Sequence, residues 1–115
     1  MRSTPLSIKT TVRGSVPRLQ FEKMAQAVLG NSYELSLVIC GDSLAERINK
    51  EYRSKSYSTN VLSFEIGKHD GEIFLNLRKA EREARSAGIP AKKRFALLFV
   101  HGLFHLKGLK HGVRM

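Results

Sequence analysis

The spacing of apolar residues divides the first forty residues into three predicted elements. Apolar and β-branched side chains alternate with polar ones over residues 6–13, which predicts a strand with one buried face. Over residues 17–29 apolar side chains recur at spacings of three and four, which predicts an amphipathic helix ended by Gly30. Residues 33–40 are rich in aliphatic and β-branched side chains. They predict a second, more deeply buried strand.

A helix is predicted over residues 43–53, directly after the second strand. Ser43 is followed three residues later by Glu46, the spacing of a capping box. Beyond this start the apolar positions again follow a helical period. Residues 55–60 are then expected to form the loop that leaves the helix.

The second half of the chain predicts a hairpin followed by two helices. Residues 61–66 and 72–77 are short runs that favour strands, and five residues join them. Residues 78–87 are good helix formers before a Gly and a Pro, and residues 91–107 predict a further helix. The fold class is therefore α+β, with a small mixed sheet of about four strands packed with helices.

Composition limits the class of protein. A chain of 115 residues with 42% hydrophobic residues suits a single domain over residues 1–115. A formal net charge of +10 favours polyanionic partners, nucleic acid or ribosome first and an acidic membrane surface second. The longest apolar run, Phe95–Val100, is too short to span a bilayer, and the first residues do not resemble a signal peptide. We therefore expect a cytoplasmic protein without a membrane partner, in which the single cysteine, Cys40, is a buried strand residue.

Three histidines near the C-terminus are candidate metal ligands. His101 and His105 are four residues apart in a predicted helix, so their side chains emerge one turn apart on the same face. If the helix ends around Gly108, the chain can fold back so that His111 supplies a third ligand. Three protein ligands leave a coordination position open for water, whose pKa a divalent metal lowers towards neutrality. From spacing alone, ordinary structural histidines remain the alternative.

Residues 101–111 read HGLFHLKGLKH, and they resemble the H-G-x-x-H-L-x-G-x-x-H signature of the YbeY family of bacterial endoribonucleases and ribosomal RNA maturation factors. Two upstream segments match in order and spacing. Tyr52-Arg53 and residues 58–64, STNVLSF, look like the family's YR and T-(D/N)-V-L-S-F stretches, and residues 71–73 resemble its G-D-I.

The resemblance implies a function and a site. It implies a zinc-dependent, single-strand-specific endoribonuclease that acts in ribosomal RNA maturation, including the 3′ end of the small-subunit RNA, and in ribosome quality control. It assigns one Zn²⁺ per chain to His101, His105 and His111, and it places Arg53 in the metal cleft as a catalytic residue. Ribosomal RNA and the ribosomal small subunit are the implied partners. A guanidinium beside a metal can hold a phosphate through two oxygens and stabilise charge that develops in the transition state.

The sequence departs from the family's pattern at several positions. The family typically has an aspartate before its third histidine, where this chain has Lys110, and it typically continues into an acidic helix, where this sequence stops at Met115. Glu65 replaces a usual proline. Lys110 puts a positive charge beside the expected dication, which predicts weaker metal binding or an additional phosphate contact.

Two other functions compete with the endoribonuclease. One is a non-catalytic RNA-binding or ribosome assembly protein with a structural metal, which would not need Arg53. The other is a metalloprotease, disfavoured because Gly102 stands where the H-E-x-x-H motif has its glutamate.

His69 is expected to be an exposed turn residue outside the site. A basic region that either tracks an RNA backbone or is simply solvated comprises Arg78, Lys79, Arg82, Arg85, Lys92, Lys93 and Arg94.

Overall fold

Four strands and four helices make up the part of the chain that the structure, a computed structural model, describes: residues 6–110, with side chains as far as Gly108. In chain order they are β1 (Leu6–Thr10), α1 (Phe21–Leu29), β2 (Glu34–Cys40), α2 (Asp42–Arg53), β3 (Val61–Gly67), β4 (Asp70–Asn76), α3 (Leu77–Ala87) and α4 (Ala91–Lys110). The predicted α+β fold with a small mixed sheet is confirmed. None of the helices within residues 6–110 has the length and apolar character needed to cross a membrane.

The strands form one sheet in the order β1-β2-β4-β3. β1 and β4 run parallel to β2 on its two sides, and β3 runs antiparallel to β4. The predicted hairpin is therefore confirmed, with a tighter connection of Lys68 and His69 between the two strands. This order places β3 at one edge of the sheet.

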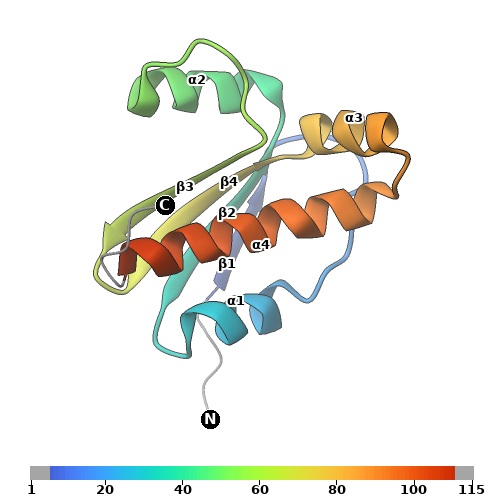
Figure 1. Cartoon of the computed structure of the whole chain (residues 1–115). Helices are drawn as coiled ribbons and strands as arrows, with labels where there is room; N and C mark the ends of the chain where they lie inside the picture. Colours follow the sequence, from blue (N-terminus) through green and yellow to red (C-terminus); the bar gives the residue numbers. More distant parts are fainter. Residues whose placement is uncertain (1–5, 111–115) are drawn as a thin grey trace.

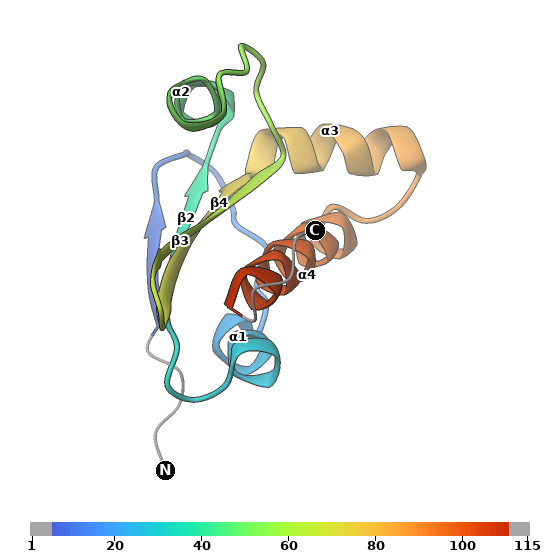
Figure 2. The same cartoon turned by 60° about the vertical axis from the view of Figure 1, so that its left-hand side comes forward.

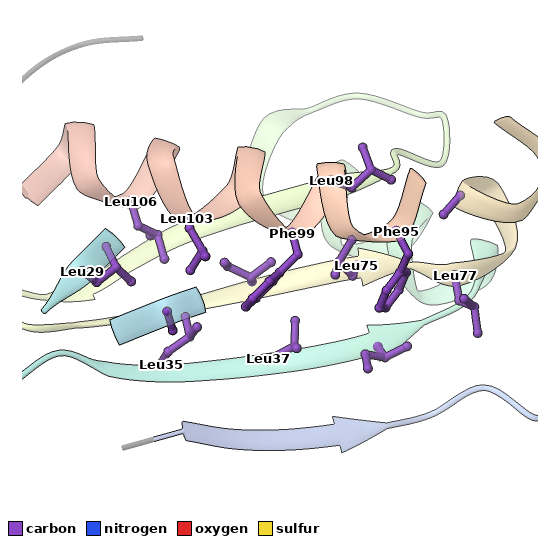
Figure 3. Packing of buried hydrophobic residues seen from close by; sticks show 14 of the residues in the cluster. Leu29, Leu35, Leu37, Leu75, Leu77, Phe95, Leu98, Phe99, Leu103 and Leu106 are labelled. Atoms are coloured by element: carbon purple, nitrogen blue, oxygen red, sulfur yellow. The ribbon is translucent and has the colours of Figure 1, made fainter. Parts of the chain in front are cut away.

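One face of the sheet carries the main hydrophobic core. Alternate residues of β2 and β4 point to this face, and α1 and α4 cover it (Figure 1, Figure 2). Figure 3 shows side chains of α4 above the strands, with Phe95, Phe99 and Leu103 fully buried at spacings of four. Each such buried side chain stabilises the fold by about 1.5–3 kcal/mol relative to its exposed form.

The opposite face is covered in part by α2, which lies on the other side of the sheet from α4 (Figure 2). Val38 and Cys40 of β2 pack there with Ala45 of α2. Cys40 is fully buried, as predicted. β2 is a central strand and is covered on both faces of the sheet. Its sequence is therefore an almost continuous apolar run.

Two predictions, one about the start of α2 and one about the first strand, are wrong. No side chain caps α2, which begins at Asp42 after Gly41, so Ser43 and Glu46 do not form a capping box. The carboxylate of Asp42, the first residue of α2, is bound by Arg82 of α3. The first strand ends at Thr10, and Ile8 is 47% exposed, because β1 lies at an edge of the sheet that the helices cover incompletely.

Two helix boundaries also differ from prediction. α1 begins at Phe21 and not at Pro17, since Val16 and Leu19 pack against the core from the connecting segment. α4 continues through Gly108 to Lys110, whereas the sequence predicted an end near Gly108. Gly108 is buried and therefore serves as a packing residue within the helix.

A buried asparagine joins three elements at the end of β4. The Asn76 side chain accepts a hydrogen bond from the backbone N–H of Lys79 at 3.1 Å, which caps α3, and its Nδ2 donates to Asp42 Oδ1 at 2.9 Å. Arg82 binds both oxygens of Asp42 at 2.8 Å. The hydrogen bonds from Arg82 and Asn76 and the charge of Arg82 hold the pKa of Asp42 well below its usual range.

We expect Asp42→Asn to lower the melting temperature by a few degrees at pH 7, because the ion pair with Arg82 is lost. Since the folded state lowers the pKa of Asp42, its stabilisation is fully present above the ordinary aspartate pKa of about 3.9 and is lost progressively as the pH falls from there through the lowered pKa of the folded state. In thermal melts between about pH 2 and pH 7, the difference in melting temperature should therefore be constant down to about pH 4 and shrink below it. A difference in melting temperature that does not change with pH would contradict this assignment.

Candidate active site

Three elements enclose a cavity of about 370 Å³ at the β3 edge of the sheet. Figure 1 shows β3 between α2 and α4. Arg53 enters the cavity from the last turn of α2, and His101 and His105 enter from α4. Residues 61–64 of β3 form the remaining wall. Three of the four residues that the sequence assigned to the site therefore line one cavity.

The two histidines differ in their surroundings although they lie one turn apart. His101 is exposed, while His105 is half-buried. Burial lowers the pKa of His105 below its usual value, and the charges of His101 and Arg53 lower it further. At neutral pH His105 is therefore held in the uncharged form, which is the form that coordinates metal ions.

A glycine next to His101 lets α4 approach the sheet. A side chain at Gly102 would place its Cβ 3.0 Å from Ser63 Oγ and 3.2 Å from Ile73 Cδ1, closer than ordinary packing. Ser63 Oγ also donates a hydrogen bond to the Gly102 carbonyl at 3.1 Å. These contacts set the height of the two histidines above β3.

The loop between α2 and β3 fixes the position of Arg53. Ser54 ends α2 in the left-handed conformation, with φ of 57°. Asn49 Nδ2 donates to the Tyr57 carbonyl at 2.9 Å, and Asn76 Nδ2 donates to the Thr59 carbonyl at 3.1 Å. Lys79 Nζ adds a hydrogen bond to the Ser58 carbonyl at 2.7 Å. Near Arg53 itself, the Lys55 N–H donates to the Asn49 carbonyl at 3.3 Å, so the loop is held at both ends.

Sequence reasoning missed Asn49 and Asn76, although both side chains are almost fully buried. Asn76 directly precedes a predicted helix, and an asparagine there is typical of an N-cap. That signal could have identified it. Asn49 lies inside α2 without any such signal, and only the folded chain shows that it binds the loop.

Several predicted residues lie elsewhere. His69 is exposed in the β3–β4 turn and does not line the cavity, as expected. His111 lies outside the described residues, and the residues described contain no group of three or more side chains suited to a metal. In the basic region, Arg82 pairs with Asp42, Arg94 with Glu83, and Arg78 with Glu81. These three cations stabilise the fold, which reduces their freedom to follow an RNA backbone.

The fold and the site together define an α+β protein with two histidines and an arginine in a cavity beside an antiparallel edge strand. A family model described as Endoribonuclease YbeY matches residues 6–114. The chain therefore belongs to the YbeY family, as its motifs predicted.

Curated relatives agree with this assignment. Endoribonuclease YbeY of Aromatoleum aromaticum is 36% identical over 92 residues, which cover 77% of this chain and 60% of that protein. The protein of the same name from Geobacter sulfurreducens is 35% identical over 105 residues, covering 80% of this chain and 70% of the relative. The chain thus spans between 60% and 70% of the length of these two relatives.

A solved structure supports the fold. The solution structure of a Thermotoga maritima protein matches with a TM-score of 0.66 at 20% identity, covering 90% of this chain and 72% of that one. At this identity the match concerns the fold alone.

Proposed function

We propose that this protein is a metal-dependent endoribonuclease that cleaves single-stranded RNA. One observation carries the proposal: in a chain of the YbeY family, an arginine and two histidines one turn apart line the same small cavity. The name shared by the relatives, Endoribonuclease YbeY, supports RNA as the substrate. The net charge of +10 supports a polyanion.

Zinc is the proposed metal, with His101, His105 and His111 as its ligands. Neutral imidazoles suit zinc, and the lowered pKa of His105 favours that form. The role of His111 rests on its place in the family motif. A divalent ion at this site would supply Lewis acidity and lower the pKa of a water molecule.

Arg53 is proposed to bind the scissile phosphate. Its guanidinium can contact two phosphate oxygens at once and neutralise the negative charge that develops during cleavage. Ser63 also lines the cavity, and its hydroxyl donates a hydrogen bond to the Gly102 carbonyl. This engagement makes Ser63 a support for α4, and we do not assign it a role in proton transfer.

Ribosomal RNA precursors are the proposed natural substrate, as the family resemblance implies. The proposed roles are maturation of the 3′ end of the small-subunit RNA and ribosome quality control. The ribosomal small subunit would then be a partner.

The function is tested by measuring metal content and cleavage on the same preparation. We expect about one zinc per chain by elemental analysis, and cleavage of a single-stranded RNA that stops with chelator and returns with zinc. The same RNA annealed to its complement is the matched control and should be cleaved far more slowly. A zinc-loaded protein that binds single-stranded RNA without cleaving it would instead support the non-catalytic assembly protein.

A further inference from the structure

An aromatic side chain beside the cavity is mostly exposed. Tyr52 belongs to the last turn of α2, directly before Arg53, and 66% of its surface is accessible. Its ring centroid lies 5.0 Å from that of Phe64, with the planes tilted by 55°. Phe64 in turn meets Phe74 edge-on at 6.0 Å. Tyr52 therefore packs against one ring, Phe64, which Phe74 holds in turn, and most of the Tyr52 surface is open.

The supporting ring connects Tyr52 to the candidate active site. Phe64 lines the cavity together with Arg53, His101 and His105. Tyr52 thus lies at the rim of the cavity, next in sequence to the residue that we propose binds the phosphate. Near it in sequence, α2 and the following loop expose the cations Lys50 and Lys55 together with Glu46 and Glu51, so the local charge is positive when Arg53 is included.

We infer that Tyr52 stacks against an unpaired base of the RNA strand whose phosphate Arg53 binds. This inference rests on the proposed function and adds a residue that selects single strands. Nucleobases stack on exposed aromatic rings, and a cationic surface beside such a ring follows the sugar-phosphate backbone. A duplex keeps its bases stacked on one another, so it cannot offer one to Tyr52. The stacking surface therefore favours single-stranded RNA without reading its sequence.

A purely structural role for Tyr52 predicts different behaviour. A side chain that only covers Phe64 could be replaced by leucine, which is also apolar, without any consequence that depends on an RNA base. A stacking residue instead needs an aromatic ring, which phenylalanine retains and leucine lacks. The two roles can therefore be separated by combining protein variants with RNA that lacks single bases.

The test is single-turnover cleavage by the zinc-loaded protein at increasing protein concentration. The half-saturating concentration reports binding, and the maximal rate reports chemistry. The substrates are a single-stranded oligoribonucleotide with one mapped cleavage site and versions with one abasic nucleotide at each of the neighbouring positions. We expect one abasic position to raise the half-saturating concentration of the wild type by about tenfold.

Tyr52→Leu should raise the half-saturating concentration of the intact RNA by about tenfold, and that one abasic position should cause no further loss. Tyr52→Phe should behave like the wild type. Tyr57→Leu is the matched control, because Tyr57 is also exposed, at 57%, but its ring faces Lys79 and, within the described residues, makes no ring contact with Phe64 of the cavity wall.

Two results would overturn the inference while leaving the proposed function intact. In the first, the wild type cleaves RNA, and Tyr52→Leu has the same half-saturating concentration as the wild type. In the second, the abasic nucleotide raises the half-saturating concentration of Tyr52→Leu by the same factor as that of the wild type. This result would count even if Tyr52→Leu melts at a lower temperature. A zinc-loaded wild type that cleaves no RNA would overturn the proposed function itself.

Discussion

Replacing Arg53 with alanine is expected to lower the rate of RNA cleavage by about two orders of magnitude or more, which corresponds to roughly 3 kcal/mol of transition-state stabilisation. The expected loss lies in the maximal rate, because the guanidinium acts on charge that develops during the reaction. Metal content and most of the RNA affinity should remain. Single-turnover cleavage and elemental analysis of the variant measure these quantities.

The structure gives a reason why this substitution should spare the fold. Arg53 is exposed at the end of α2, and it takes part in none of the ion pairs formed within residues 6–110. The loop beyond it is held by Asn49, Asn76 and Lys79. Removing the guanidinium therefore leaves these supporting contacts in place, and the melting temperature should change little.

Two further variants make the Arg53 result specific. Arg53→Lys should recover only part of the rate, because an ammonium lacks the planar fork that matches two phosphate oxygens. Arg47→Ala removes another exposed arginine from the same helix, but Arg47 lies at a different cavity, so catalysis should persist. Equal cleavage by wild type and Arg53→Ala would refute the catalytic assignment.

Replacing either His101 or His105 with alanine should weaken zinc binding by at least about a hundredfold. Loss of a residue that only hydrogen-bonds to a metal ligand typically lowers metal affinity ten- to hundredfold, and loss of a ligand itself should lower it more. Competition with a chromophoric zinc chelator gives the affinity of each variant. Because zinc that binds only the folded state raises the melting temperature, its stabilising effect should also be lost in both variants.

His69 provides the matched control for the two histidines. It lies exposed in the β3–β4 turn and away from the cavity, so His69→Ala should bind zinc as tightly as the wild type. His111→Ala tests the third proposed ligand, which lies outside the described residues. If His69→Ala weakens binding as strongly as His101→Ala, the proposed ligand set is wrong.

The sequence by itself determined most elements and much of the site. Runs of β-prone residues predicted β2 and the β3–β4 hairpin, and helical spacing, helix propensity and stop signals predicted the helices. The spacing of four between His101 and His105 was sufficient to place both on one face of a helix. Local chemistry of this kind needs only neighbouring residues, so it can be read directly from the chain.

Only the tertiary structure decided which elements meet. A hydrophobic period does not name the partner against which an element packs, so the order β1-β2-β4-β3 and the approach of α4 to β3 could not be inferred. The predicted capping box at Ser43 fails because α2 already begins at Asp42, so that Ser43 lies inside the first turn of the helix. Arg53 and His105 are far apart in sequence. They line one cavity because packing across the sheet, which depends on the whole chain, brings the end of α2 and the face of α4 to the same edge strand.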